Sequence, residues 1–597
     1  MKKTIGIFVS ILFILCISLP EAQGQRRNRN NQEEEKSSDP LSGVSLNNLK
    51  FRGVGPALTS GRIADIAVHP EKPNEFYVAA AAGGVWKTTN AGTTFRPIFD
   101  NYGSYSIGAL AIDPNNHNIL WVGTGENNNQ RSVSYGDGVY KSIDGGASFQ
   151  HMGLKNSEHI GMIAIHPGNS DVVYVAATGP LWSSGGDRGL YKTTDGGATW
   201  DLVLAISEHT GINEVHLDPR NPDVIYATSH QRRRRQWTYL GGGPESGIHK
   251  STDGGETWKE INKGLPGGDK GRIGLDISPA NPEIIYAIVE AQSGKGGFYR
   301  STNRGASWER MSGHSTSGNY YQEIVADPID ENRVYSLNTF TMVTTDGGKT
   351  FNQLGEQSKH WDNHAIWINP NNNHHMLQGS DGGVYETFDQ GQTWKFFTNL
   401  PVTQFYKVSV DNDEPFYNIM GGTQDNYSLH GPSQNLSRHG IISSDWRVTQ
   451  GGDGFESVAD PENPDIVYAQ FQNGGLSRFD LKSGESVTII PRPRKGEKQY
   501  NFNWDSPIMV SPHDAKTLYY GANKLFKTTD RGDTWEVISD DLDQDIDRNL
   551  LPVMDKIWPM DAVAKNSSTS RYGAIVSLAE SRIQEGLIYA GSDDGQI

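Results

Sequence analysis

A nine-residue turn sequence occurs eight times along this 597-residue chain, and no other feature restricts its possible folds as strongly. The clearest copy is KTTDGGATW, from Lys192 to Trp200. The other copies read KTTNAGTTF, KSIDGGASF, KSTDGGETW, RSTNRGASW, VTTDGGKTF, ETFDQGQTW and KTTDRGDTW. Each copy, called an Asp turn below, has an Asp or Asn, then Gly two residues later, Ser or Thr four residues later, and an aromatic. The central residues are Asn90, Asp144, Asp195, Asp253, Asn303, Asp346, Asp389 and Asp530.

A second element precedes most Asp turns. It is a short apolar segment ending in Pro, followed seven residues later by an aromatic residue. The pairs are Pro70–Tyr77, Pro114–Trp121, Pro167–Tyr174, Pro219–Tyr226, Pro279–Tyr286, Pro328–Tyr335, Pro461–Tyr468 and Pro512–Tyr519, whereas Pro370 is followed at this offset by Leu377. Successive prolines from Pro70 to Pro370 lie 42 to 60 residues apart. A period of about 40–50 residues with four strands in each is typical of β-propeller blades.

Each period divides into four strands with alternating or continuous apolar residues, which in the first period are IADIAVHP, EFYVAAA, GVWKTT and TFRPIF. Ten units are recognisable, of which residues 404–450 and 454–490 lack the Asp turn. We therefore predict an all-β chain with a seven-bladed propeller at 51–400 and a partial second propeller at 401–597. A single ring of ten blades, as in sortilin, is the alternative. In either case LKFRGVGP, at 49–56, is expected to supply the strand that closes the ring.

Both ends of the sequence carry expectations of their own. Residues 1–24, with an apolar run from Ile5 to Leu19, are predicted to be a secretory signal peptide, and residues 25–50 a disordered leader. The single cysteine, Cys16, lies in the signal, so no disulfide is expected in the mature chain. The final segment, LIYAGSDDGQI, stops after a second strand, which indicates a truncated sequence.

Composition and charge limit the function classes. The chain has a net charge of −17, whereas nucleic-acid binding needs clustered basic residues, so no nucleic-acid partner is expected. No further segment is long and apolar enough to span a membrane. We expect an exported protein in the periplasm, at the cell surface or outside the cell.

The Asp of the turn is expected to brace the fold rather than to act as a catalyst. Its carboxylate can accept hydrogen bonds from amides of its own turn, and the following Gly supplies a positive φ. The terminal Trp or Phe can fill the gap between sheets. Asn90 and Asn303 keep the turn although an amide cannot perform acid–base chemistry, which favours the structural role.

The Asp turn resembles the Asp-box, or bacterial neuraminidase repeat, over most of the chain from about Phe51. Together with the Pro–aromatic element, it looks most like bacterial exported proteins with a sortilin-type N-terminal propeller. Those proteins are similar in turn to xyloglucan-cleaving glycosidases built from two seven-bladed propellers. The resemblance implies a catalytic Asp just before the Gly-Gly of the first blade, and in YVAAAAGGVW the matching place holds Ala81.

Loop lengths indicate which face of the propeller binds ligands. The spacing from Pro to the aromatic is fixed, whereas the spacing from the aromatic to the Asp turn varies, so insertions fall between the second and third strands. These loops share a face with the start of the first strand, and variable loops on a rigid scaffold commonly carry binding sites. The residue eight positions before each Pro marks that start, near the mouth of the central channel. These residues are Arg62, Ser106, His159, Gly211, Gly271, Tyr320, Asp362, Asp453 and Trp504.

The densest polar cluster is KHWDNHAIW, in which strand alternation would place His360, Asp362 and His364 on one side. These three residues could ligate a structural divalent cation, or they could form a hydrogen-bond network that lines the channel. No other cofactor is expected. Comparable places in later strands hold polar residues that we also take as candidates, namely Asp381, Gln424, Asp425 and Asp453.

Two long loops add candidate ligand-binding residues. GTGENNNQRSVSYGDG supplies Glu126 and Arg131. Arginines beside aromatics in the second loop could hold a carboxylate- or sulfate-bearing chain, or they could be a solvated charge run. This loop, SHQRRRRQWTYLGGGPESG, supplies Arg232, Arg233, Arg234, Arg235 and Trp237. The acidic run at 540–549 could hold calcium, or it could be a solvated linker.

Three functions remain open. The first is an exported recognition protein that binds a peptide or glycan on the loop-rich face. The second is a glycoside hydrolase, for which a carboxylate pair such as Asp381 with Asp425, or Asp453, would be catalytic, although Ala81 argues against direct transfer of the xyloglucanase mechanism. The third is a purely structural interaction domain.

Overall fold

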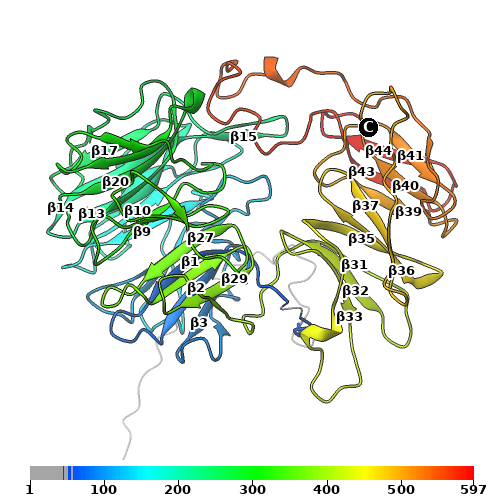
Figure 1. Cartoon of the computed structure of the whole chain (residues 1–597), viewed down its shortest axis with the longest axis horizontal. Helices are drawn as coiled ribbons and strands as arrows, with labels where there is room; N and C mark the ends of the chain where they lie inside the picture. The colour runs from blue at the N-terminus through cyan, green and yellow to red at the C-terminus, as the bar shows by residue number, and fades with distance from the viewer. Residues whose placement is uncertain (1–44, 46–50, 56–57) are drawn as a thin grey trace, which may run out of the picture. The chain divides into compact units, whose positions relative to one another are not determined.

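The computed structural model describes Ser45, residues 51–55 and residues 58–597. In this part the chain forms ten four-stranded antiparallel sheets and two two-stranded sheets (Figure 1). Contacts divide the chain into Met1–Gly53 and Val54–Ile597. The predicted signal peptide lies outside the described residues, as does the predicted leader apart from Ser45. The expected all-β fold of propeller blades is confirmed.

Seven of the sheets follow one another from Ile63 to Phe396, and each runs in chain order from its first strand to its last. The first four are β1–β4 (Ile63–Val68, Phe76–Ala80, Gly84–Thr88, Arg96–Pro97), β5–β8 (Ile107–Ile112, Leu120–Thr124, Val139–Ser142, Gln150–His151), β9–β12 (Ile160–Ile165, Val173–Ala177, Gly189–Thr193, Asp201–Leu204), and β13, β14, β17 and β18 (Thr210–Asp218, Asn221–Gln231, Gly247–Ser251, Lys259–Glu260). The next three are β19–β22 (Lys270–Ile277, Ile285–Ala291, Gly297–Ser301, Glu309–Ser312), β23–β26 (Ile324–Ala326, Val334–Ser336, Met342–Thr344, Asn352–Gln353) and β27–β30 (Asn363–Ile368, Met376–Ser380, Gly383–Thr387, Lys395–Phe396).

The first of these sheets packs against the seventh and closes a ring. Strand β1 contacts β5 on one side and β27 on the other (Figure 1). Apolar residues from both sheets share one core, in which Ile63, Leu377 and Phe397 are buried. Burial of large apolar side chains is the main stabilising term in folding, and here it joins the first sheet to the seventh. The seven sheets therefore close into one ring, which excludes the alternative of a single ring of ten blades.

The remaining sheets form a second series after residue 400. They are β31–β34 (Phe405–Val410, Asn418–Thr423, Ser428–Pro432, Arg447–Gln450), β35–β38 (Gly454–Asp460, Asn463–Phe471, Gly475–Asp480, Ser486–Thr488), β39–β42 (Ile508–Val510, Leu518–Gly521, Leu525–Thr528, Glu536–Val537), and the pair β43 and β44 (Ile575–Glu580, Ile588–Ser592). Their first strands pack in succession, β31 on β35, β35 on β39 and β39 on β43.

The expectation of a closing strand from LKFRGVGP is wrong for residues 51–55, which form no strand. There the Val54 carbonyl accepts a hydrogen bond from Trp446 Nε1 at 2.9 Å.

Each Asp turn is closed by hydrogen bonds within itself. In the third sheet, Asp195 Oδ1 accepts from Thr193 Oγ1 at 2.7 Å and from the Thr199 N–H at 2.9 Å, while Oδ2 accepts from Thr199 Oγ1 at 2.6 Å. These bonds lower the pKa of Asp195 to about 2. Gly197 has a φ of 98°, a conformation that side chains with a Cβ rarely adopt.

Neighbouring sheets are linked by side chains other than the Asp. Tyr174 Oη and Lys192 Nζ both donate to the carbonyl of Gly254, in the Asp turn of the next sheet, at 2.9 and 2.8 Å. In this blade the tyrosine seven residues after Pro, together with the Lys of KTT, therefore joins the blade to the following one. Tyr77 makes the same bond to Gly145.

Insertions lie between second and third strands, as the loop lengths predict. The longest builds a hairpin, β15 (Arg233–Arg235) and β16 (Thr238–Leu240), between β14 and β17. The helical content of the described residues is three single-turn 3-10 helices, η1 (Gln292–Gly294), η2 (Ser443–Asp445) and η3 (Arg548–Leu550). No helix in the described ranges has the length and apolar character that a membrane span requires.

Candidate functional site

A buried arginine lies at the centre of the polar cluster. Arg62 comes immediately before β1, and its side chain is 2% exposed. Its Nη1 donates to Glu126 Oε2 at 2.7 Å, and its Nε donates to Asp381 Oδ1 at 2.8 Å. Its Nη2 lies 3.8 Å from Asp425 Oδ2. One guanidinium thus holds carboxylates from the second, seventh and eighth sheets.

Asp381 is the ionised member of this group. It occupies the turn between β28 and β29, and its side chain is 1% exposed. Burial alone would raise its pKa, but the charges of Arg62 and His364 outweigh burial and hold the pKa of Asp381 well below its usual range. His364 Nε2 lies 2.9 Å from Asp381 Oδ1.

Asp381 stands at the structural equivalent of Ala81. The Ala81 N–H bonds to the carbonyl of Arg62 at 2.9 Å, and the Asp381 N–H bonds to the carbonyl of Asp362 at 3.0 Å. Arg62 and Asp362 hold the same repeat position, eight residues before Pro. The seventh blade therefore supplies a carboxylate at the turn where the first blade has alanine.

Asp425 is the member with a raised pKa. It follows β32 with a φ of 58°, and its side chain is 26% exposed. Its N–H donates to Asp453 Oδ1 at 2.6 Å. Burial and the negative charge of Asp381 raise the pKa of Asp425 well above its usual range. Of two carboxylic groups side by side, one therefore has a raised pKa and the other a depressed pKa, a pattern that separates an acid from a base in enzymes.

Two tyrosines complete the cluster. Tyr320 donates its hydroxyl hydrogen to Asp381 Oδ2 and receives a hydrogen bond from Gln424 Nε2 at 3.3 Å. Tyr321 donates to Asp362 Oδ1, and its ring stacks on His364. Tyr320 lies eight residues before Pro328, so the repeat predicts its place near the channel mouth. No sequence motif around it indicates a catalytic role.

The predicted arrangement of His360, Asp362 and His364 on one side of a strand is wrong. Strand β27 begins at Asn363, and Asp362 has a φ of 60°, which breaks the alternation before the strand starts. His360 Nδ1 instead lies 2.9 Å from the carbonyl oxygen of Trp361. Asp362 and His364 join the cluster through Tyr321 and Asp381, and His360 does not.

The remaining candidates fall into two groups. Glu126 and Gln424 are in the cluster, since Glu126 binds Arg62 and Gln424 binds Tyr320. His159 is buried beneath it, with Nδ1 2.9 Å from the Glu126 carbonyl oxygen, and burial together with the charge of Arg232 lowers its pKa to about 3. Arg131 lies at the edge, over the ring of Trp504 at 3.9 Å.

The run of four arginines is not a solvated surface. Arg232, Arg233 and Arg234 are each 1% exposed, while Arg235 is half-buried. Arg234 Nε donates to the Asn129 carbonyl at 3.0 Å, and its Nη1 donates to the Ser568 carbonyl at 3.1 Å. These residues hold loops in place. Trp237 is half-buried, with its ring 6.0 Å from that of Tyr572.

Two groups of potential metal ligands occur among the described residues. In the first, one oxygen each from Asp362, Asp381 and Asp425 lies within 4.8 Å of the others. Arg62 already supplies a positive charge to this group, and the raised pKa of Asp425 favours its neutral form. The arrangement therefore suits proton chemistry better than a divalent cation.

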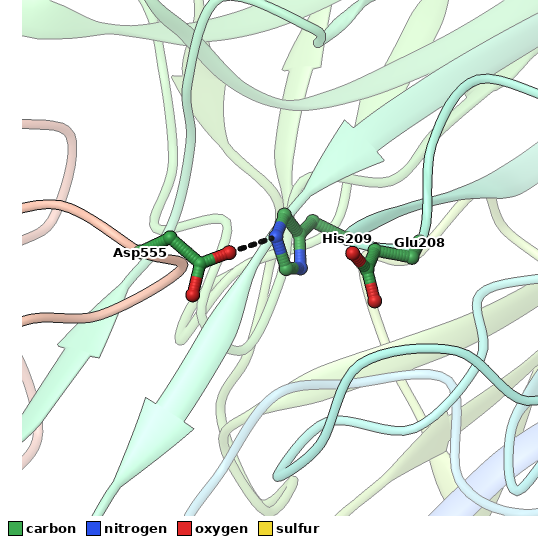
Figure 2. Close-up of side chains that lie close together, drawn as sticks. All are labelled: Glu208, His209 and Asp555. Atoms are coloured by element: carbon green, nitrogen blue, oxygen red, sulfur yellow. Dashed lines mark ion pairs between the residues drawn. The ribbon is translucent and has the colours of Figure 1, made fainter.

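The second group is Glu208, His209 and Asp555, shown in Figure 2. His209 Nε2 faces Asp555 Oδ2 at 3.4 Å, whereas its Nδ1 lies 3.4 Å from Arg233 Nη2. An arginine can only donate, so Nδ1 accepts and the ring proton is on Nε2. His209 is thus held between Arg233 and Asp555.

Comparisons with known proteins agree with this architecture. The family model described as sortilin, neurotensin receptor 3, matches residues 137–267. A xyloglucanase of Hypocrea jecorina is 25% identical over 390 residues, covering 63% of this chain and 38% of the relative. An oligoxyloglucan-reducing end-specific xyloglucanase of Emericella nidulans is 24% identical over 221 residues, covering 34% of this chain and 24% of that protein.

Among solved structures, the GH74 enzyme of Niastella koreensis has a TM-score of 0.53 at 18% identity, covering 83% of this chain and 74% of that one. The matched segments span only 24% to 38% of the two curated relatives. The solved structure therefore supports the fold, and the sequences relate the chain to xyloglucanases at modest identity. The chain is an all-β propeller protein that is similar to xyloglucanase-type proteins.

Proposed function

We propose that this protein is an exported glycoside hydrolase that cleaves a polysaccharide, with Asp425 as its general acid. The observation that carries the proposal is the close pairing of a partly exposed Asp425, whose pKa is raised, with a buried Asp381, whose pKa is depressed. Glycosidases need a carboxylic acid that remains protonated near neutral pH to protonate the leaving oxygen. The similarity to xyloglucanases supports the same class of reaction.

The cluster supplies two parts of such a reaction. Asp425 can deliver its proton because its side chain is 26% exposed, and the fixed charge of Asp381 keeps that proton in place before reaction. The glycosidic transition state develops positive charge on the sugar ring. Carboxylates held rigidly by Arg62 and Tyr320 would stabilise that charge without reorganising.

Asp381 itself does not activate the attacking water in this scheme. Its nearest oxygen lies within 4.8 Å of Asp425, whereas an acid and a base that act on opposite faces of a sugar stand about 6.5–9.5 Å apart. Asp381 is also 1% exposed. Asp453 is also close to Asp425, since its Oδ1 accepts a hydrogen bond from the Asp425 N–H at 2.6 Å, and it is 5% exposed, so the proposal assigns the acid and no base.

The test is release of reducing ends from xyloglucan and from a panel of other glucans and acidic polysaccharides. Asp425→Asn keeps the shape of the side chain but cannot donate the proton, so activity should fall about 10²–10⁴-fold. Asp195→Asn, in an Asp turn away from the cluster, is the matched control and should retain activity. Full activity in Asp425→Asn, or no product from any substrate with the wild-type protein, would refute the proposal.

A non-catalytic glycan-binding protein is the competing proposal. Ala81 favours it, because the first blade lacks the carboxylate that the resemblance to xyloglucanases implies. Under this alternative the cluster would hold polysaccharide without cleaving it. Binding of a polysaccharide by the wild-type protein with no release of product over hours would decide for it.

A further inference from the structure

Six arginines gather around the β15–β16 hairpin, and their hydrogen-bond partners in the described part of the chain are uncharged. Arg188 donates to the carbonyls of Gly185, Pro180 and Ser183, and Arg232 donates to Asn129 Oδ1 and the Gly179 carbonyl. Arg233 donates to His209, Arg235 donates to the Trp182 carbonyl, and Arg131 donates to the Ser568 carbonyl. Arg234 donates to the carbonyls of Asn129 and Ser568 and to Asn319 Oδ1. In a protein with a net charge of −17, such a set of cations without acidic partners is exceptional.

The lack of countercharge has an energetic cost. Taking guanidinium groups out of water without a paired anion is unfavourable. Burial lowers the pKa of both Arg232 and Arg234 to about 9, and Nε of Arg232 and of Arg233 is buried without a hydrogen-bond partner. Arg232 and Arg233, each 1% exposed, do not meet a ligand themselves, but they raise the positive potential of the surface nearby, and Arg234, also 1% exposed, lines a pocket in that surface.

That surface contains a pocket of about 290 Å³. Its lining includes Arg131, Arg235 and Trp182, and one carboxylate, Asp593. Asp593 Oδ1 accepts hydrogen bonds from the N–H groups of Gly573 and Ala574 at 2.8 and 2.9 Å, and its Oδ2 accepts one from Asn503 Nδ2 at 3.4 Å, so its hydrogen-bond donors are uncharged groups rather than the arginines. Arg131 and Arg235 are half-buried and each makes one hydrogen bond to a carbonyl, which leaves further guanidinium donors for a ligand.

The pocket adjoins the carboxylate cluster. Ser132, the residue after Arg131, places its Oγ 3.3 Å from Tyr406 Oη and 3.4 Å from Gln424 Oε1. Gln424 in turn binds Tyr320 and is followed in the chain by Asp425. A chain of sugar units that places one glycosidic oxygen at Asp425 can therefore place a neighbouring unit in the arginine pocket.

We propose that this pocket is a subsite for a carboxylate-bearing sugar, so that the polysaccharide recognised by the protein contains uronate units. A planar guanidinium matches a carboxylate through two parallel hydrogen bonds, and the stacking of Arg131 on Trp504 at 3.9 Å fixes the plane in advance. Trp182 supplies an aromatic face for the sugar ring. The proposal rests on the proposed function only for the location of the cleaved bond, since binding is measured separately.

The experiment measures binding of an oligogalacturonate, its methyl ester and a neutral xyloglucan oligosaccharide by titration calorimetry. Asp425→Asn serves as the background, because it prevents turnover. The free acid should bind at least about tenfold more tightly than the methyl ester, and its affinity should fall as salt rises. Arg131→Gln and Arg235→Gln should each weaken binding of the acid about tenfold or more and leave that of the ester unchanged.

Controls separate recognition from folding. Arg96→Gln removes an exposed arginine on β4 and should leave every affinity unchanged. Arg131→Lys keeps the charge but loses the planar pair of donors, so it should bind more weakly than wild type even when its thermal unfolding is normal. Equal affinity for acid and ester, or tight binding of a sulfated oligosaccharide with no binding of the uronate, would overturn the proposal. Uronate binding without any hydrolysis by the wild type would refute the proposed function alone.

Discussion

Replacement of Arg62 by methionine tests whether the cluster is held by one buried cation. The Arg62 side chain is 2% exposed and lies 2.7 Å from Glu126 Oε2 and 2.8 Å from Asp381 Oδ1, and those two side chains are 0% and 1% exposed. Removing one partner of a buried ion pair typically costs about 3–5 kcal/mol because the other charge remains unpaired. Arg62→Met leaves two such charges, so the loss in the free energy of unfolding should reach at least the upper end of that range. Asp381→Asn should cost less, since Arg62 keeps Glu126.

The loss of stability in Arg62→Met should also depend on pH. In the wild type the pKa of Asp381 is depressed, so its contribution to stability is complete above the unfolded-state value of about 4 and declines as the pH falls below it. Without Arg62, burial should raise the pKa of Asp381 above the unfolded-state value. The folded variant then loses stability at every pH at which the carboxyl is ionised in the unfolded state. The destabilisation should therefore be greatest near pH 7 and shrink towards pH 4.

Urea unfolding followed by tryptophan fluorescence between pH 4 and pH 8 measures both effects. Lys482→Met is the control, because Lys482 is 78% exposed and its ion pair with Asp465 should contribute little. Equal losses for Arg62→Met and Asp381→Asn, with no dependence on pH, would refute the idea that Arg62 compensates several carboxylates at once.

Three further predictions concern the scaffold. Tyr226→Phe removes the hydrogen bond from Tyr226 Oη to the Arg304 carbonyl at 3.2 Å and should lower stability by about 1 kcal/mol in urea unfolding; an unchanged midpoint would contradict its role between blades. His159 has a pKa of about 3 against an unfolded-state value of about 6.5, so wild-type stability should fall as pH decreases through that window, and His159→Gln should flatten the fall in a pH series of melting temperatures. Asp195→Asn should keep the melting temperature closer to wild type than Asp195→Ala does, because an amide oxygen still accepts the Thr199 N–H; equal losses would show that the turn needs the charge.

The repeat allowed much of the fold to be predicted, because strand order and blade length are local properties of the sequence. IADIAVHP forms β1 and GVWKTT forms β3, while TFRPIF shortens to Arg96–Pro97. Gln424 holds the place equivalent to Asp381 in the next blade, and Asp425 is the residue after it, so the repeat brings Asp381 and Asp425 near each other. Their opposite pKa shifts do not follow from the repeat, because they depend on Arg62, which is more than 300 residues away in sequence from Asp381.

The arginine run shows why the rest could not be predicted. A series of like charges is usually solvated, and nothing in QRRRRQW indicates that Arg234 would be buried against Ser568, 334 residues further along the chain. The strand assignment at His360 failed for a different reason. Asp362 has a positive φ, and this single residue shifts the start of β27 to Asn363. An aspartate with positive φ cannot be recognised from the alternation of polar and apolar residues.

The exception in the repeat, Leu377, lies in the blade that packs against the first one. In three other blades a tyrosine hydroxyl reaches a carbonyl in the Asp turn of the following blade, as Tyr77 reaches Gly145. Leucine has no such donor, and the first turn is instead held by Asn399, whose Nδ2 donates to the carbonyls of Gly92 and Thr93 at 3.0 and 2.9 Å. The junction of the last and first blades of the ring thus depends on an amide side chain that comes after the fourth strand, where other junctions use a hydroxyl on the second strand.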